Sequence, residues 1–213
     1  MPAENNFGRH FFMAKTVFNP SQQELDIPSK ITAGLERISE VFKSQLWEKA
    51  KKVGLSPIQI QILIFIAHHK SDLCTVSYLA QEFNITKPTV SDAIKVLHLK
   101  KMVIKDFSSS DSRSYILQLS ELGKKLVSET SDFAEILRNK ISTQNGNDLS
   151  IVLQSLNKLI YDLNQQGILQ VQRHCYGCKF YTKNGKEHYC GFLEKALLEN
   201  EIRIDCPEFE TKK

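Results

Sequence analysis

The sequence lacks the signatures by which common enzyme classes are recognised. Its 213 residues contain no phosphate-binding loop, no glycine-rich nucleotide fingerprint and no His-Glu-x-x-His zinc motif. Its carboxylates form no obvious catalytic pair along the chain, and no internal repeat is present. These absences predict a protein that is not an enzyme.

Long apolar runs and an export signal are also missing. The longest purely apolar run is Ile62–Ala67, which is far shorter than the about 20 residues of a membrane-spanning helix. The first residues include Glu4 and no long apolar stretch, so they do not resemble a secretory signal. We therefore expect a cytoplasmic protein with no membrane partner.

The chain has little excess charge of either sign. Its 28 basic and 24 acidic side chains give a net charge of +4, which by itself does not identify a nucleic-acid partner. Hydrophobic residues make up 41% of the chain and charged residues 24%, as in ordinary globular proteins, which excludes a disordered or collagen-like chain. The length fits one domain with an attachment, or two small domains.

Helical periodicity dominates the first part of the chain. Apolar residues at three- and four-residue steps predict a helix over residues 27–50, after a partly ordered arm over residues 1–26. Ser56 followed by Pro57 is typical of a helix start, and the helix Pro57–His69 is apolar on nearly every side, which predicts a central position.

Two amphipathic helices are predicted further along, over Ser120–Thr143 and Asp148–Gln165, with Gly167 ending the second. The apolar stripes of the first and last helices are too extensive to be left exposed, and a small domain cannot cover both. They favour pairing with a second copy of the chain, although the two stripes packing against each other within one chain is the alternative.

Residues 75–100 have the pattern of a helix-turn-helix. Thr75 can cap a short helix, Asn84 suits a left-handed turn position, and Thr86 can cap a longer second helix. Residues 102–119 then change to a two-residue period, which predicts two strands joined by a polar loop. A helix pair followed by a strand pair predicts a winged helix-turn-helix.

The second of these helices divides into an apolar and a polar face, as expected of a helix that enters the DNA major groove. Residues 86–113 contain six basic and three acidic side chains. Hydroxyl groups and lysines can bind phosphates or base edges, and an arginine at a wing tip can enter a narrow minor groove. The candidate DNA-binding residues are Thr86, Lys87, Thr89, Ser91, Lys95 and Arg113. A winged helix that serves only as a protein-interaction module is the alternative.

Several short motifs between residues 53 and 127 resemble the MarR family of winged-helix transcription regulators. The matching residues are Leu55-Ser56-Pro57-Ile58-Gln59, Leu79-Ala80, Thr86-Lys87-Pro88-Thr89-Val90-Ser91, Lys100-Lys101-Met102-Val103, Asp111-Ser112-Arg113-Ser114 and Leu119-Ser120-Glu121-Leu122-Gly123. The resemblance implies a homodimer whose outer helices form the dimer core and whose two winged domains read a palindromic operator in double-stranded DNA. It also implies a repressor or activator that is often controlled by a small-molecule effector or by oxidation.

The chain departs from the family pattern in two places. Ser114 follows the wing motif where the family usually has a charged residue, and about 45 residues follow the last family helix. Residues 27–167 therefore form the predicted winged-helix domain with its dimerisation helices, and residues 168–213 form a cysteine-rich attachment.

Four of the five cysteines lie in this attachment, in the pattern Cys175-x2-Cys178-x11-Cys190-x15-Cys206. In a reducing compartment such a cluster indicates a metal site rather than disulfides. Four thiolates suit tetrahedral zinc or an iron–sulfur cluster such as [4Fe–4S]. The irregular spacing and the proline after Cys206 favour the cluster.

Other assignments of the cysteines and histidines remain open. A structural zinc ion would leave a small ligand as the signal, and a thiol–disulfide enzyme that uses Cys175 and Cys178 is the enzyme alternative. His174 and His188 adjoin the cysteines and could replace a thiolate, whereas Cys74 is expected to be an inert buried thiol.

The sequence as a whole predicts a mainly α fold with a small β-hairpin wing and a metal-stabilised C-terminal segment. The predicted function is sequence-specific DNA binding by a homodimeric transcription regulator, with a four-cysteine metal centre that senses metal or redox state.

Overall fold

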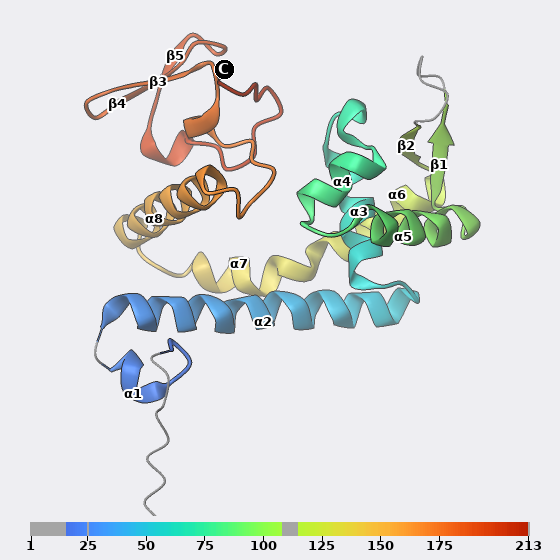
Figure 1. Cartoon of the computed structure of the whole chain (residues 1–213), viewed down its shortest axis with the longest axis horizontal. Helices are drawn as coiled ribbons and strands as arrows, with labels where there is room; N and C mark the ends of the chain where they lie inside the picture. Colours follow the sequence, from blue (N-terminus) through green and yellow to red (C-terminus); the bar gives the residue numbers. More distant parts are fainter. Residues whose placement is uncertain (1–15, 25, 108–114, 213) are drawn as a thin grey trace, which may run out of the picture. The chain divides into compact units, whose positions relative to one another are not determined.

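The structure is a computed structural model that describes residues 16–24, 26–107 and 115–212. The chain divides into two compact units, residues 1–45 and 46–213, which are described separately. The first unit contains the short helix α1 (Pro20–Gln23) and most of the long helix α2 (Ile27–Val53) (Figure 1). The Asp26 carboxylate accepts the backbone N–H of Ser29 at 2.7 Å, which caps the start of α2.

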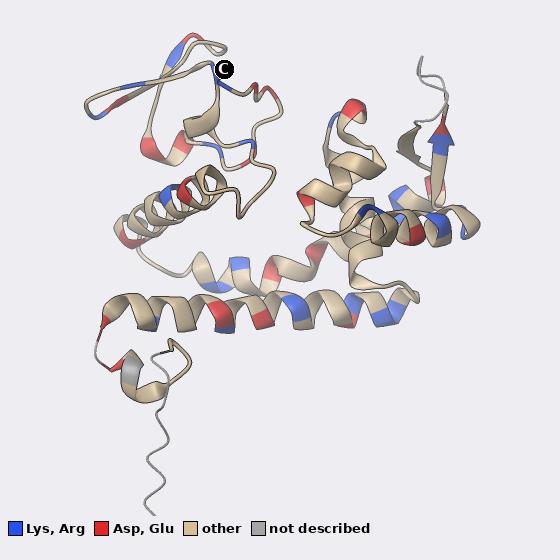
Figure 2. Cartoon of the chain, in the orientation of Figure 1, with Lys and Arg blue, Asp and Glu red and all other residues tan. Residues whose placement is uncertain are grey.

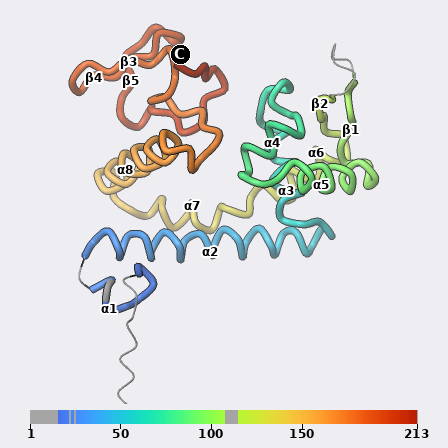
Figure 3. The backbone as a smooth tube through the Cα atoms, viewed as in Figure 1, coloured from blue at the N-terminus to red at the C-terminus, as the bar shows by residue number. Residues whose placement is uncertain are grey.

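The second unit is built around α3 (Pro57–His68), which is the central helix that the sequence predicts. Ser56 and Gln59 form a capping box at its start, and six of its twelve residues are buried. The short helix η1 (Ser71–Leu73) leads to α4 (Val76–Glu82) and α5 (Lys87–Leu99). Figure 3 follows the backbone through these helices into the two strands that come next.

The turn between α4 and α5 is the tight turn expected of a helix-turn-helix. Thr75 caps α4 by accepting the N–H of Tyr78 at 3.2 Å. Asn84 has a φ of 51°, the left-handed conformation that the sequence predicts at this position. Together they fix the angle at which α5 leaves α4.

The predicted wing is present as two short antiparallel strands, β1 (Val103–Asp106) and β2 (Ile116–Leu119). Val103 pairs with Leu119, and Leu117 is buried against the core. The Leu117 N–H donates to the carbonyl of Cys74 at 2.8 Å, which ties the wing to the segment before α4. The loop between the strands, residues 108–114, lies outside the described residues.

The prediction of one continuous helix over Ser120–Thr143 is wrong. The chain instead forms α6 (Glu121–Thr130), η2 (Ser131–Ala134) and α7 (Glu135–Ile141). The buried Thr130 hydroxyl donates to the carbonyl of Leu126 at 2.8 Å, a contact that bends helices. Asp132 pairs with Lys49 of α2 at 2.6 Å, and the chain forms a 3₁₀ turn at this position.

The chain then forms α8 (Gly146–Gln165), which ends before Gly167 at a φ of 72°. Most of the apolar stripe of α8 is not buried; Val152 and Leu159 are 48% and 41% exposed. Asn157 is the buried residue of this helix.

The cysteine segment, residues 168–212, contains more regular structure than the sequence indicates. It begins with η3 (Cys175–Gly177) and continues as a three-stranded antiparallel sheet of β3 (Tyr181–Asn184), β4 (Glu187–Cys190) and β5 (Lys195–Leu197), followed by η4 (Glu199–Glu201). Its small core contains Cys175, Cys178, Tyr181, Leu197 and Ile202. The strands have only three or four residues each, so the alternation of polar and apolar residues is too short to predict them from the sequence.

Among the described residues, no single helix is long and apolar enough to cross a membrane. The pair α2 and α3 meets the length and composition test only when taken together, across a bend of 92°. α3 is the core helix of the second unit, with six buried residues.

Candidate nucleic-acid interface and metal centre

Helix α5 presents two distinct faces. Its buried face packs on the core through four residues, which are Val90, Ala93, Ile94 and Leu97. The predicted DNA-binding residues of this region are all exposed: Thr86, Lys87, Thr89, Ser91 and Lys95. The structure therefore brings these five side chains together on and beside the solvent side of one helix.

The N-terminus of α5 is organised by two threonines. The Thr86 hydroxyl accepts the Thr89 N–H at 3.3 Å and lies 2.8 Å from the Thr89 hydroxyl. Pro88 lies in the first turn, where a missing N–H costs nothing. The helix start combines exposed hydroxyls, the charge of Lys87 and the positive end of the helix dipole, which together suit an anionic phosphate.

Basic residues occur along α5 and β1 (Figure 2). Lys105 of β1 stacks over the Tyr115 ring at 4.6 Å, and Tyr115 leads into β2. Lys100 is not free for a ligand, because its Nζ donates to the Gly54 carbonyl at 2.6 Å. The wing-tip residue Arg113, with Asp111, lies outside the described residues.

The four predicted metal-binding cysteines line one cavity of about 320 Å³. Cys175 and Cys178 come from the η3 turn, Cys190 from the end of β4, and Cys206 from the segment after η4. All four are free thiols. The cavity wall also contains aromatic and aliphatic side chains with two cations, namely Phe180, Phe192, Leu193, Leu197, Lys195 and Arg203.

Two donors already point at the sulfur atoms. The Arg203 backbone N–H donates to the Cys175 sulfur at 3.2 Å, and the Arg203 guanidinium donates to the Cys206 sulfur at 3.6 Å. Burial raises the pKa of the Cys175 thiol, and the neighbouring thiols raise it further against the Arg203 N–H. A bound metal would displace this proton, because it favours the thiolate.

The two histidines beside the cysteines do not line the cavity. Both ring nitrogens of His188 are engaged, with the Tyr181 hydroxyl and with Glu199 at 3.0 Å. The fully buried His174 accepts the Tyr176 N–H on Nδ1, so its proton resides on Nε2. Burial lowers the pKa of His174 to about 4. The cysteines therefore remain the donor set of the cavity.

Burial of Cys175 does not activate its thiol. A reactive cysteine needs a lowered pKa, whereas burial raises that of Cys175. Cys74 is 1% exposed and its pKa is raised to about 11 by burial and by Asp72, which agrees with an inert thiol.

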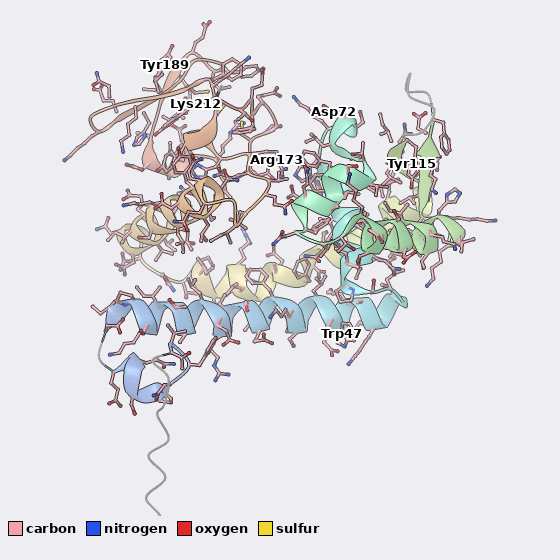
Figure 4. All side chains as sticks on the ribbon, viewed as in Figure 1. Trp47, Asp72, Tyr115, Arg173, Tyr189 and Lys212 are labelled. Atoms are coloured by element: carbon pink, nitrogen blue, oxygen red, sulfur yellow. The ribbon has the colours of Figure 1, made fainter. Side chains whose placement is uncertain are left out.

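Sequence reasoning missed a charge network around the buried Arg173, which is labelled in Figure 4. The guanidinium of Arg173 binds Asp205 through two hydrogen bonds of 2.6 and 2.9 Å. It also binds Glu82 of α4 through bonds of 2.7 and 3.1 Å, and donates to the Tyr78 hydroxyl at 2.8 Å. These partners are far apart along the chain, so no local spacing could reveal them.

His69 completes the network at the end of α3. Its Nδ1 donates to the Phe65 carbonyl at 2.9 Å, and its Nε2 lies 3.0 Å from the Asp205 carboxylate and 3.2 Å from Arg173. Burial opposes ionisation of Asp205, but the hydrogen bonds from Arg173 and His69 outweigh it and lower the Asp205 pKa. The network therefore keeps its charges at neutral pH.

Comparison with known proteins places the winged-helix part of the chain. The family model described as "MarR family" matches residues 53–114. S. aureus MepR in a complex with DNA has a similar structure, with a TM-score of 0.54 and 25% identity over 62% of this chain and 97% of MepR. S. aureus MepR in its DNA-binding conformation gives a TM-score of 0.55 and 25% identity over 62% of this chain and 98% of that chain.

The transcriptional regulator PA3341 shares the fold, with a TM-score of 0.55 and 21% identity over 63% of this chain and 98% of its own. No curated protein sequence matches the chain. The family match agrees with the resemblance to MarR regulators that the sequence motifs indicate. Residues 53–114, which include α3, α4, α5 and β1, are therefore similar to the MarR family of proteins.

Proposed function

We propose that the protein is a sequence-specific DNA-binding transcription regulator that works in the cytoplasm. The observation that carries this proposal is the exposed polar face of α5, where Thr86, Lys87, Thr89, Ser91 and Lys95 lie on a helix fixed by its buried face. This face would enter the major groove, while Arg113 of the wing would enter the adjacent minor groove. The likeness to MepR, which has been seen in a complex with DNA, supports this reading.

Selection of duplexes from random-sequence DNA by the full-length protein tests the proposal. We expect a palindromic site, because two copies of α5 would read two half-sites. Lys95→Ala should weaken binding to that site and reduce the dependence of log affinity on log salt by about one, as the loss of one phosphate contact does.

The matched control is Lys158→Ala, which removes an exposed lysine of α8. It should leave affinity and salt dependence unchanged. If no sequence is enriched, or if the two variants behave alike, the assignment of α5 to the groove is wrong.

We further propose that the functional form is a homodimer. The apolar side chains along α2 and α8 are exposed in the single chain; Ile31 is 56% exposed and Val152 is 48% exposed. A second copy of the same chain is the occupant that suits both helices, since a palindrome requires two winged domains related by a two-fold axis.

We also propose that the four-cysteine cavity holds a metal centre, and that the centre is an iron–sulfur cluster such as [4Fe–4S]. A single tetrahedral zinc ion with bonds of about 2.3 Å draws its four sulfur atoms to roughly 3.8 Å from one another. In the described part of the chain, no group of three or more His, Cys, Asp or Glu side chains is arranged to hold a metal ion. The four thiols surround a shared volume of about 320 Å³ instead.

A [4Fe–4S] cluster fits that arrangement because each thiolate binds a different iron at a separate corner of the cluster. Hydrogen bonds to the sulfurs and nearby cations stabilise such clusters, and Arg203 and Lys195 provide both at the cavity wall. The loading of the centre with metal would then report the supply of iron or the presence of oxygen.

Purification without oxygen, followed by iron, sulfide and zinc analysis, tests the cofactor. We expect a brown protein with iron and sulfide in equal amounts. Cys190→Ser should lose the iron, whereas Cys74→Ser, the same change at a buried cysteine outside the cavity, should retain it. Far-ultraviolet circular dichroism checks that both variants are folded.

A colourless protein with one zinc ion per chain would overturn the cluster. It would support the alternative of a structural zinc and a small-molecule effector. Full iron content in Cys190→Ser would remove Cys190 from the ligand set.

A further inference from the structure

The cysteine segment touches two elements that have different roles in a winged-helix dimer. On one side its Arg173 binds Glu82 and Tyr78 of α4, the first helix of the helix-turn-helix. On the other side Tyr176 packs edge-on against Tyr161 of α8, with ring centres 5.9 Å apart. The segment therefore bridges the predicted dimerisation helix and the DNA-binding module.

Further contacts strengthen both ends of the bridge. Gln170 donates to the Asn84 side chain at 3.2 Å, and Lys70 pairs with Glu208 at 2.9 Å. At the α8 end, the Asn164 side chain donates to the Leu169 carbonyl at 2.7 Å. These contacts lie within one compact unit of the chain, residues 46–213.

The Arg173 contact is the strongest part of the bridge. Arg173 is 8% exposed, and its partners on both sides are carboxylates. Loss of either carboxylate leaves N–H donors of the buried guanidinium without an acceptor, which is unfavourable. The hydrogen bonds of Arg173 are therefore favourable when both carboxylates are in place and unfavourable when one is missing. We expect them to form and break together.

The network is directly continuous with the cavity. Asp205 precedes Cys206, and the Cys206 backbone N–H donates to the Arg173 carbonyl at 3.0 Å. Arg173 and Asp205 also form a parallel β-bridge. A metal that fixes Cys206 in the cavity therefore also fixes the Asp205 carboxylate opposite Arg173.

We propose that Arg173 is the positioning residue through which metal loading of the four-cysteine cavity controls DNA binding. This inference rests on the proposed DNA-binding and metal-binding functions. With metal bound, Arg173 holds α4 in a fixed relation to α8, and the two copies of α5 in the dimer match their half-sites. Without metal, the Asp205 side of the network loosens, α4 is released, and affinity for the palindrome falls.

The test compares metal-loaded and chelator-treated full-length protein on the palindromic duplex selected by the wild type, at one salt concentration. Wild type should bind at least about fivefold more tightly when loaded, within the usual range of coupling between sites. Arg173→Met should bring this ratio to one while metal content per chain stays unchanged. Glu82→Gln should do the same from the α4 side, away from the cavity.

Arg138→Met is the matched control, because Arg138 is an exposed arginine with a partner three residues away. It should keep the wild-type ratio. The link is overturned if Arg173→Met keeps that ratio, if Arg173→Met loses its metal, or if loaded and depleted wild type bind the duplex equally.

Hydrogen exchange separates failure of the link from failure of the proposed function. Amides of α4 should exchange more slowly in loaded than in depleted wild type, and Arg173→Met should remove this difference, whether or not DNA binds. Unchanged exchange in a protein that does bind metal and DNA would overturn the link alone.

Discussion

Gly123 lies where the first turn of α6 passes the backbone carbonyl of Met102. A Cβ atom at this position would lie 2.2 Å from the Met102 oxygen, and no flexible side chain is available to give way. We expect Gly123→Ala to lower the free energy of unfolding by about 3 kcal/mol, at the upper end of overpacking penalties. Urea denaturation followed by circular dichroism measures it.

Gly146→Ala is the control for this change, because nothing lies within 4 Å of the added methyl group. It should alter stability by no more than about 0.5 kcal/mol. Equal effects of the two substitutions would contradict the steric argument.

The conformation and contacts of single residues differ in how well the sequence predicts them. Asn84 and Gly167 could be predicted because their residue types suit a left-handed backbone at helix ends. Lys101 has a φ of 57° although lysine has no such preference, so only the surrounding packing could reveal it. The contacts of Arg173 could not be predicted for a similar reason, because its partners lie 32 and 91 residues away along the chain.

At the scale of elements, α4 depends on its N-cap because it is only seven residues long. Thr75→Ala removes the oxygen that accepts the Tyr78 N–H. We expect a loss of about 1 kcal/mol in the free energy of unfolding. Thr32→Ala, a substitution at an exposed position within α2, should lower the free energy of unfolding much less. Urea denaturation of both variants measures the two losses, and a larger loss in Thr32→Ala would contradict the capping role of Thr75.

The elements with strong periodicity are the ones that the sequence could predict. The bounds of α3, α4 and α5 agree with the capping residues Ser56, Thr75 and Thr86. The break after Thr130 could not be predicted, because it depends on a side-chain hydrogen bond and on the distant Lys49. The sheet of the cysteine segment escaped prediction because its strands have three or four residues each.

At the scale of the whole molecule, the exposed apolar stripe of α8 predicts that charged substitutions in it dissociate the dimer. Val152→Lys combined with Leu159→Lys should convert a dimer into monomers in sedimentation equilibrium, since burying two ammonium groups in an apolar interface is very unfavourable. Gln154→Lys lies on the other side of the helix and should leave the dimer intact. A monomeric wild type, or a double variant that stays dimeric, would refute the assignment of this face.

The charge network also imposes an order in time on the nascent chain. Glu82 is synthesised first, Arg173 follows 91 residues later, and Asp205 emerges after a further 32 residues. The winged-helix core can therefore fold on the ribosome while Glu82 still lacks its arginine, and the Arg173 guanidinium gains its last hydrogen-bond acceptors only when Asp205 has left the exit tunnel. A polypeptide interrupted before residue 205 would leave Arg173 with Glu82 as its carboxylate partner and without Asp205, so the link between α4 and the end of the cysteine segment forms only after almost the whole chain has been synthesised.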